Sequence, residues 1–303
     1  MRLRNLVATA LALLISIVLL LQPQAAAAAE KPAFVSFDFP LAGVLDTEAT
    51  GITPSGVIVG RYSSPDYVGH GFILDKGEFR SIDVPGSTFT DVTWINAAGV
   101  IVGNYGSPDG THKGFVLANG RFTTVAYPGN PETFALYGIS DGGNIVGPVC
   151  DCIWSTADGF LDRHGEFSLI NFPGAMGTYP TMLINPGLVV GAYLDQSSHY
   201  HGFLMKDGNF TTIDYPGSTF TWFTGVNPKG TMVGFYMDAT GQHGLEYDLN
   251  TDRFLVVDVP VPGSSSSEVN GINRQGDIVG RYIGPDGRTH AYFMRAGSRE
   301  TDE

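Results

Sequence analysis

The sequence contains few cysteines and few basic residues, and each shortage excludes a class of protein. Its two cysteines, Cys150 and Cys152, cannot form the framework of a disulfide-rich scaffold. Only 17 Lys and Arg residues stand against 30 Asp and Glu residues, so the surface repels nucleic acid and anionic lipid. After residue 21, no apolar run is long enough to cross a bilayer, and no window has a useful length of helical apolar periodicity. We therefore expect no nucleic-acid partner and no helical fold.

Motifs of the common enzyme classes are also missing. The sequence has no G-x-S-x-G, no H-E-x-x-H, no phosphate-binding glycine loop and no EF-hand loop. Its 40 glycines are expected in turns and between closely spaced strands. We expect no cofactor, except that Ca²⁺ is considered below as an alternative.

The first 29 residues have the pattern of a secretory signal peptide. Arg2 and Arg4 precede an apolar segment, Leu6–Leu21, and the Ala25–Ala29 run offers small residues for cleavage. A retained membrane anchor is the alternative, because the apolar segment approaches spanning length. We expect a bacterial protein that is secreted or periplasmic, with no membrane insertion after cleavage. The remaining 274 residues carry 15 basic and 30 acidic residues, a balance that suits neutral polymers or cations as partners.

Two independent markers show that the rest of the chain repeats one unit six times. The glycine of an I-V-G segment recurs every 43 to 46 residues, at Gly60, Gly103, Gly147, Gly191, Gly234 and Gly280. The proline of an I-D-x-P segment recurs in step with it, at Pro40, Pro85, Pro128, Pro173, Pro216 and Pro260. A period of this length indicates a repeat architecture.

Each copy contains four short strand candidates separated by turn residues. In the second copy the first two strands are Thr90–Ile95 and Val100–Tyr105. The third strand is an H-G-F-L run, as in His201–Leu204, and the fourth ends at the I-D-x-P proline, which cannot continue a ladder. Four antiparallel strands in six copies predict an all-β fold, a six-bladed β-propeller over residues 30–295, followed by a polar tail, residues 296–303.

The two ends of the chain supply complementary parts of one blade. Phe34–Pro40 has the pattern of a fourth strand with no blade before it, and His290–Met294 has that of a third strand with no fourth strand after it. We expect Ala33–Phe39 to pair with Tyr292–Arg295, which closes the ring and hides two sheet edges. The alternative, an open β-solenoid, would need capping segments. We expect a monomer.

Copies that read I-N-x-x-G-x-I-V-G-x-Y and then H-[GA]-[FY] resemble the HAF-type extracellular repeat family of bacteria. The matching segments include Ile95–Tyr105 with Gly114–Phe115, and Ile272–Tyr282 with His290–Phe293. The resemblance implies an exported, propeller-like protein and assigns no role. The third copy departs from the pattern at Pro148 and Asp158, so we expect features particular to this protein in blade three.

The histidine that precedes G-F in several copies is not expected to bind a metal ion. These histidines lie on the third strand of different blades, too far from the axis to share one ion. We expect each to form a hydrogen bond that ties the third strand to a neighbouring blade or to the aspartate of the I-D-x-P segment. The two sets are His70, His201, His243 and His290, and Asp38, Asp83, Asp214 and Asp258.

Five residues before the I-N position, each first strand carries a residue that should face the axis. In blade order these residues are Glu48, Asp91, Ala135, Pro180, Trp222 and Glu268. Glu48, Asp91 and Glu268 fall in consecutive blades of a closed ring, which predicts an acidic arc. Such an arc could supply catalytic acid and base groups or hold Ca²⁺. The alternative is a solvated channel mouth without a function of its own.

Loops on the same face carry hydroxyl and aromatic residues. Ser87 and Thr88 lie in the second copy, Ser218 and Thr219 in the fifth, and Trp94, Tyr137 and Trp222 on adjoining first strands. Rings with hydroxyl groups suit stacking and hydrogen bonding to sugars, while the alternative is that these are turn residues and packed rings. Cys150 and Cys152 lie on this face, where we expect a local disulfide.

Together these features predict an exported binding or scaffold module for an extracellular polysaccharide or a cell-surface protein. One alternative is a glycan lyase or hydrolase that uses the three acids, and another is a purely structural envelope protein. An enzyme would need two of the acids around one pocket, with pKa values displaced in opposite directions.

Overall fold

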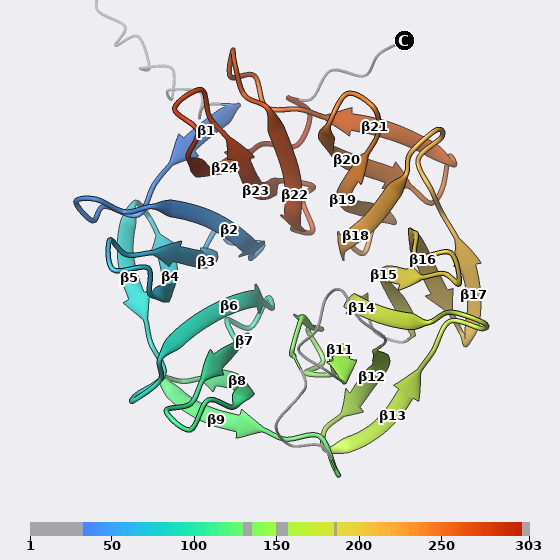
Figure 1. Ribbon diagram of the computed structural model, residues 1–303, viewed down its shortest axis with the longest axis horizontal. Helices are drawn as coiled ribbons and strands as arrows, with labels where there is room; N and C mark the ends of the chain where they lie inside the picture. Colours follow the sequence, from blue (N-terminus) through green and yellow to red (C-terminus); the bar gives the residue numbers. More distant parts are fainter. Residues whose placement is uncertain (1–32, 130–134, 150–156, 185–186, 299–303) are drawn as a thin grey trace, which may run out of the picture. The chain divides into compact units, whose positions relative to one another are not determined.

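A computed structural model describes residues 33–129, 135–149, 157–184 and 187–298. Within these residues the regular secondary structure consists of β-strands, which form six antiparallel blades around a central axis (Figure 1). The predicted six-bladed propeller is confirmed. In the described part of the chain, no helix is long and apolar enough to cross a membrane. The predicted signal peptide lies outside the described residues.

In each blade the first strand lies next to the axis and the fourth lies at the perimeter (Figure 1). The strands of blade one are β2 (Asp46–Ile52), β3 (Ile58–Ser63), β4 (Gly69–Asp75) and β5 (Glu78–Ile82). Those of blade two are β6 (Phe89–Ile95), β7 (Ile101–Gly106), β8 (His112–Ala118) and β9 (Arg121–Val125). Those of blade three are β10 (Gly138–Ile139), β11 (Ile145–Val149), β12 (Asp158–Arg163) and β13 (Glu166–Ile170).

Blades four to six follow the same order. Blade four contains β14 (Gly177–Ile184), β15 (Leu188–Leu194), β16 (Tyr200–Lys206) and β17 (Asn209–Thr212). Blade five contains β18 (Phe220–Val226), β19 (Thr231–Met237), β20 (Gln242–Asp248) and β21 (Arg253–Val257). Blade six contains β22 (Ser266–Ile272), β23 (Ile278–Ile283) and β24 (Thr289–Met294), and its outer strand is β1 (Phe34–Phe37).

The N-terminal strand closes the ring, as predicted. Strand β1 pairs antiparallel with β24, from Phe34 opposite Met294 to Phe37 opposite Ala291. The Arg295 amide extends this pairing by donating to the Ala33 carbonyl oxygen at 2.9 Å. An open solenoid would leave both edges unpaired, so that alternative is excluded.

The repeated I-V-G glycine is required by the distance between the first and second strands. A Cβ atom at Gly60 would lie 2.0 Å from the carbonyl oxygen of Glu48, and the other five glycines have the same relationship at 1.9 to 2.1 Å. Any side chain there would force the two strands apart. The glycine therefore also identifies the structurally equivalent residue on each first strand.

Five of the first strands contain a β-bulge at the same place. In β2 the register shifts between Ala49 and Gly51, so Thr50 is the extra residue. The equivalent bulged residues are Thr93, Thr181, Thr224 and Asn270. A bulge bends a strand and re-aims one side chain. Here it turns a polar side chain toward the next blade.

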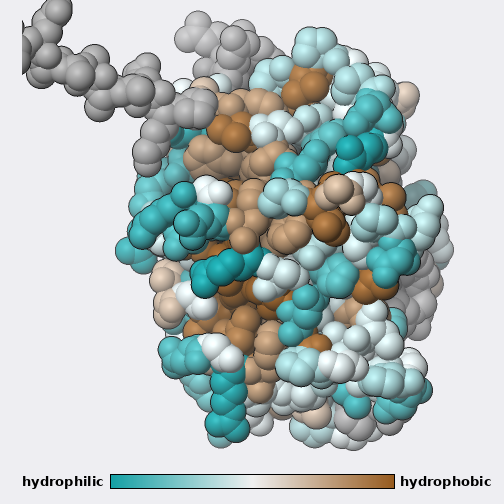
Figure 2. Space-filling model, turned by 90° about the vertical axis from the view of Figure 1, so that its left-hand side faces the viewer, coloured by the Kyte–Doolittle hydropathy of each residue, from teal (hydrophilic) through white to brown (hydrophobic). Residues whose placement is uncertain are grey.

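The core consists of apolar clusters between neighbouring blades. The largest fully buried side chains include one aromatic residue from the third strand of five blades, namely Phe72, Phe115, Phe160, Phe203 and Tyr292. Figure 2 shows one outer side of the molecule, where apolar and polar residues are interspersed. The fold thus buries its aromatic layer and leaves the axial side chains of the first strands to form a site.

Candidate functional site

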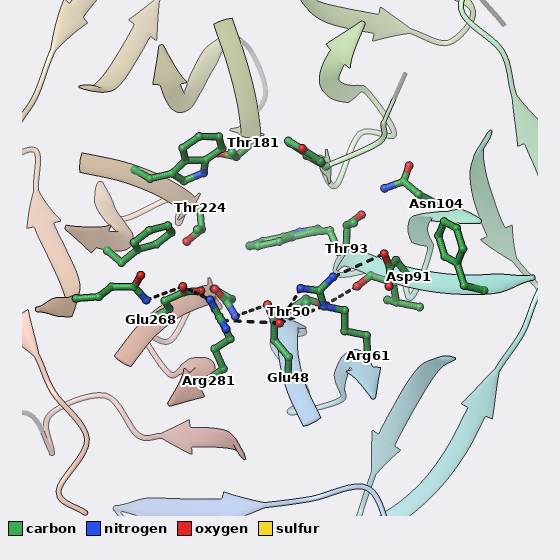
Figure 3. A pocket seen from close by; sticks show the side chains of 18 of the residues that line it. Glu48, Thr50, Arg61, Asp91, Thr93, Asn104, Thr181, Thr224, Glu268 and Arg281 are labelled. Carbon is green, nitrogen blue, oxygen red and sulfur yellow. Dashed lines mark hydrogen bonds and ion pairs between the residues drawn. The ribbon is translucent and has the colours of Figure 1, made fainter. Parts of the chain in front are cut away.

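A cavity of about 580 Å³ occupies one end of the central axis. It is lined mainly by residues of the first strands and by residues that face them on the second strands, together with His112 and Gln242 from third strands. Its walls differ in character: blades six, one and two contribute charged groups, and blades three to five contribute mainly aromatic and hydroxyl groups. Figure 3 shows the charged side chains gathered on one side, opposite Thr181.

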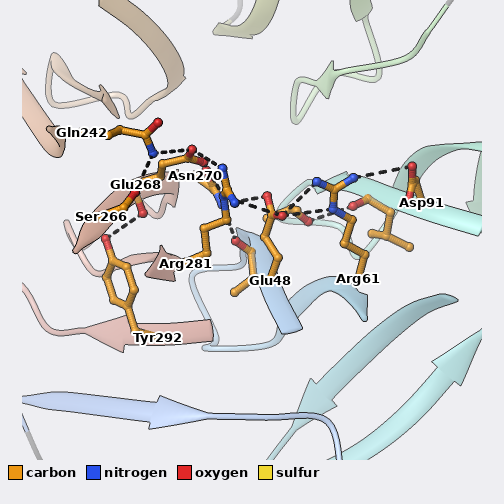
Figure 4. Close-up of polar contacts among 12 residues, drawn as sticks. Glu48, Arg61, Asp91, Gln242, Ser266, Glu268, Asn270, Arg281 and Tyr292 are labelled. Atoms are coloured by element: carbon orange, nitrogen blue, oxygen red, sulfur yellow. Dashed lines mark hydrogen bonds and ion pairs between the residues drawn. The ribbon is translucent and has the colours of Figure 1, made fainter. Parts of the chain in front are cut away.

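The charged wall is a chain of alternating carboxylate and guanidinium groups (Figure 4). Arg61 Nη2 lies 2.9 Å from Glu48 Oε2, and Arg61 Nη1 lies 3.6 Å from Asp91 Oδ2. Arg281 binds Glu268 through both Nε, at 2.7 Å, and Nη2, and its Nε lies 3.9 Å from Glu48 Oε2. The order across three blades is therefore Glu268, Arg281, Glu48, Arg61 and Asp91.

Neutral amides complete the charged wall. Gln242 Nε2 donates to Glu268 Oε1 at 2.6 Å, and Asn270 Nδ2 donates to Glu48 Oε1 at 3.2 Å. The side chain of Glu268 is only 8% exposed, whereas that of Arg61 is 46% exposed. The network thus fixes the two glutamates and leaves the Arg61 guanidinium and the Asp91 carboxylate open to a ligand.

Burial and charge displace the pKa values of the two carboxyl groups beside Arg61 in opposite directions. Burial alone would raise the pKa of Glu48, but the guanidinium groups of Arg61 and Arg281 outweigh it and hold the pKa below its ordinary value. Burial raises the pKa of Asp91, and Arg61 offsets this rise only in part. Asp91 therefore takes up a proton more readily than Glu48.

The predicted acidic arc needs a correction. Glu48, Asp91 and Glu268 do lie together in blades six, one and two, but Arg61 and Arg281 stand between them. Among the described residues, no group of three or more His, Cys, Asp or Glu side chains is arranged to hold a metal ion. The donor set does not fit the Ca²⁺ considered from the sequence, because a cation would have to displace an arginine from each glutamate.

The two arginines were missed because the sequence reasoning followed the first strands alone. Arg61 lies opposite Glu48 and Arg281 lies opposite Glu268 in the antiparallel ladders. The available signal was the residue after I-V-G, which is Arg in the first and sixth copies, where the facing residue is Glu. A cross-strand comparison would have found both ion pairs.

The predicted axial residue of blade four is also corrected. Tyr179, and not Pro180, has the backbone contact to the I-V-G glycine that Glu48 has in blade one. The cause is a shorter spacing in the sequence: Asn185 precedes Gly191 by six residues, whereas the equivalent residue in the other copies precedes its glycine by seven. Counting back from Asn185 therefore ends one residue too late.

Aromatic rings form the wall opposite the charged network. Tyr137, Phe220, Trp222 and Phe235 line the cavity. The rings of Phe220 and Trp222 are stacked at 6.0 Å between centroids, and Tyr179 supports Trp222 from behind at 5.5 Å. Two of the predicted ligand-binding residues, Tyr137 and Trp222, thus lie on this wall. Trp94, the third predicted aromatic, lines the same cavity from β6.

The other four predicted ligand-binding residues lie in turns and do not line the cavity. The Ser87 hydroxyl lies 3.1 Å from that of Thr90, and Ser218 repeats this contact with Thr221 at 3.0 Å. The backbone amides of Thr88 and Thr219 each donate to a second-strand carbonyl at 2.8 Å. The hydroxyls of Ser87, Ser218 and Thr219 bond within or beside the fourth-to-first connections, which is what turn residues commonly do.

The bulged residues form a polar belt that the sequence reasoning missed. Thr50 Oγ1 donates to the carbonyl oxygen of Val92 in the next blade at 3.0 Å. The same bond to the following blade is made by Thr93 at 2.8 Å, Thr181 at 2.8 Å, Thr224 at 2.6 Å and Asn270 at 3.1 Å. In blade three Tyr137 takes the equivalent place. The belt ties the first strands together directly beneath the charged and aromatic walls.

The predicted pairing of histidines with I-D-x-P aspartates is confirmed. The Nδ1 atoms lie 2.7 to 3.2 Å from the aspartate oxygens in the pairs His70–Asp83, His201–Asp214, His243–Asp258 and His290–Asp38. Blade three replaces the pair with Asn171, which donates to Asp158 at 2.8 Å. Asp158, where the third copy departs from the repeat pattern, therefore belongs to a hydrogen bond that takes the place of the histidine–aspartate pair. Cys150 and Cys152 lie outside the described residues.

No protein-family model matches the chain, and no curated protein matches it. The similar solved structures include six-bladed β-propellers. AofleA from Arthrobotrys oligospora covers 91% of this chain and 90% of its own, at 13% identity and a TM-score of 0.59. A six-bladed lectin from Aleuria aurantia covers 86% and 95%, at 12% identity and 0.54.

A third similar structure is TolB from Acinetobacter baumannii. It covers 81% of this chain and 65% of its own, at 11% identity and a TM-score of 0.55. Identities this low establish a shared six-bladed fold and nothing finer.

Proposed function

We propose that this chain is an exported binding module that holds a neutral saccharide in the central cavity. The observation that carries the proposal is the division of the cavity into an aromatic wall and a hydrogen-bonding wall. A pyranose ring has apolar faces of C–H groups and a rim of hydroxyl groups. Aromatic rings suit the faces, and carboxylates, guanidinium groups and amides suit the hydroxyls. A volume of about 580 Å³ lies within the range of small-molecule sites.

The charge of the site favours a neutral ligand. The network contains three carboxylates and two guanidinium groups, so it keeps one negative charge when all five are ionised. Residues 30–303 as a whole carry 30 acidic residues against 15 basic ones. Uronic acids and sulfated sugars would therefore be repelled.

The structural comparisons agree with a saccharide ligand. One of the similar solved structures is described as a fucose-specific lectin from Aleuria aurantia, at 12% identity and a TM-score of 0.52. This agreement supports the class of ligand, while the choice of sugar depends on the residues of this chain.

Glycan hydrolysis is a second candidate, and the opposite pKa displacements of Asp91 and Glu48 favour it. A raised pKa suits a general acid, and a lowered one suits a carboxylate that stays ionised. Against this, Glu48 accepts hydrogen bonds from both Arg61 and Asn270, which occupy its oxygens. Hydrolysis would be detected as new reducing ends released from neutral oligosaccharides, and would be lost in Asp91→Asn.

The proposal is tested by calorimetric titration of purified protein with neutral and uronic acid oligosaccharides. We expect a neutral sugar to bind, and Asp91→Asn and Trp222→Leu to weaken binding by about tenfold or more, which is about 1.4 kcal/mol. Glu78→Gln is the matched control, because Glu78 is an exposed acid on the outer strand β5. Binding that neither site variant changes, or an absence of binding to every neutral sugar, would refute the proposal.

A further inference from the structure

The residue that follows the bulged position of the first strand, or its equivalent in blade three, is glycine in four blades. These residues pair with the valine before the I-V-G glycine, and they are Gly51, Gly138, Gly225 and Gly271. Blades two and four carry Trp94 and Met182 at the equivalent position. In blades one, three and six, a Cβ atom at this glycine would lie 2.3 to 3.1 Å from the backbone of the next first strand, so glycine lets neighbouring first strands approach each other closely. Trp94 and Met182 are the two large side chains at this level of the ring.

Trp94 crosses the axis and reaches the opposite side of the ring. A Cβ atom at Gly225, in blade five, would lie 3.0 Å from the Cη2 atom of Trp94 in blade two. Trp94 is 4% exposed and belongs to the same apolar cluster as Met182 and Val226. Glycine at position 225 thus makes room for the indole ring.

The indole ring separates two cavities on the axis. Trp94 lines the cavity of about 580 Å³ described above, and it also lines a second cavity of about 300 Å³ at the other end. The second cavity is bounded by the turns that follow the first strands, including Asn96 and Asn227. The indole ring is therefore the floor of the larger cavity, which opens to solvent at its mouth.

We propose that the cavity is a blind site that recognises the end of a saccharide chain, with Trp94 as the residue that sets its depth. This inference rests on the proposed function. Among the residues that the structure describes, a linear chain that enters through the mouth meets the indole ring and finds no second exit, because residues of all six blades line the cavity. Internal segments of a polysaccharide would need to leave the cavity at both ends, so they are excluded.

A role of Trp94 in core packing alone makes a different prediction. A purely structural tryptophan would change the free energy of unfolding when replaced, and it would not decide which part of a glycan binds. End selectivity therefore separates the two roles, and it is measured without any substitution of Trp94.

The test uses linear glucan, galactan and mannan oligosaccharides of graded length, each free, blocked at the reducing end, or blocked at the non-reducing end with a bulky group. Calorimetric titration of the wild-type protein measures their affinities. We expect affinity to stop rising once the chain fills the cavity. We also expect one block to weaken binding by about tenfold or more and the other to have no effect.

Trp94→Gly and Trp94→Phe complete the test. Trp94→Gly gives blade two the residue that four other blades have at this position, and it should join the two cavities. The end block that weakens binding to the wild-type protein should then no longer weaken it. Trp94→Phe keeps an aromatic floor and should retain the selectivity. If Trp94→Gly does not fold, titration of the wild-type protein with the blocked oligosaccharides still tests end recognition.

The possible results are distinguishable. Wild-type binding that is insensitive to both blocks, or that keeps rising with chain length, would overturn end recognition while leaving saccharide binding intact. An absence of binding in every series would overturn the proposed function and this inference with it.

Discussion

The imidazole of His290 on β24 lies 2.9 Å from the carboxylate of Asp38, a residue 252 positions away that follows β1. Its other ring nitrogen lies 3.0 Å from Asp286. Burial would lower the pKa of His290, but the two carboxylates outweigh it and raise the pKa above its ordinary value. A protonated His290 therefore joins the N-terminal segment to the last blade where the ring closes.

This contact predicts a pH-dependent contribution to stability. The pKa of His290 is higher in the folded state than in the unfolded chain, where it is about 6.5. The stabilisation is therefore complete below about pH 6.5 and is lost as the pH rises through the folded-state pKa. We expect His290→Gln to lower the free energy of unfolding by about 1–2 kcal/mol at low pH and by less at high pH, measured by urea denaturation.

The control for this prediction is His164→Asn, in an exposed turn with a positive φ that Asn tolerates. It should change the free energy of unfolding only slightly. An equal loss of stability at low and high pH in His290→Gln would show that the proton on His290 does not matter.

The ion pair of Arg281 and Glu268 gives a second prediction. Glu268 is buried, so removing its guanidinium partner leaves a buried negative charge with only the neutral Gln242 amide as a side-chain donor. We expect Arg281→Met to lower the free energy of unfolding by about 3 kcal/mol, and the double variant with Glu268→Gln to recover part of the loss. Arg80→Met, on an exposed position of β5, should change stability by less than about 0.5 kcal/mol. Denaturant titration that found no recovery in the double variant would contradict this account.

The fold could be predicted because its rules are local and repeated six times. The I-V-G glycine recurs since every blade needs the same backbone contact, as at Gly60 and Glu48. The closing strand could be predicted because β1 has the pattern of a fourth strand without a blade before it, and the last copy ends after its third strand, β24. The pairing of His290 with Asp38 followed from the same logic, since both residue types recur in step with the repeat.

The site could be predicted only in part, because it depends on relationships between strands. Counting along the first strands located Glu48 and Asp91, but the pairing of Arg61 with Glu48 is visible only across a ladder. A bulge adds a residue without a sequence mark, so the role of Thr50 in linking two blades was not apparent. The spacing between Asn185 and Gly191, one residue shorter than in the other copies, shifted the count in blade four.

The polar belt predicts a specific cost for losing one hydroxyl. Thr181 is buried and its Oγ1 donates to the Phe223 carbonyl oxygen at 2.8 Å. Thr181→Val keeps the shape of the side chain and leaves that carbonyl without this donor, so we expect a loss of about 1–2 kcal/mol. Thr181→Ser should retain most of the stability, and Thr211→Val, at an exposed position of β17, should be nearly neutral. Equal losses in the Val and Ser variants would mean that methyl packing, and not the hydrogen bond, is what matters.

Asp91 gives the opposite kind of prediction, a substitution that stabilises the fold. Burial raises its pKa above the unfolded value of about 3.9, so ionisation of Asp91 favours the unfolded chain once the pH exceeds that value. The destabilisation is complete above the folded-state pKa. We therefore expect Asp91→Asn to raise the free energy of unfolding at pH 7 by a few tenths to about 1 kcal/mol, and to give no gain near pH 3.

The same Asp91→Asn protein should bind the saccharide more weakly, because it loses a charged acceptor that faces the cavity. Urea denaturation and calorimetric titration on one preparation measure both effects, with Glu78→Gln as the control for each. A carboxylate kept only for structure would lower stability when replaced. Higher stability together with lower affinity is the signature of a group that the fold tolerates for binding. A loss of stability at pH 7 would instead show that its ion pair with Arg61 outweighs the effect of burial.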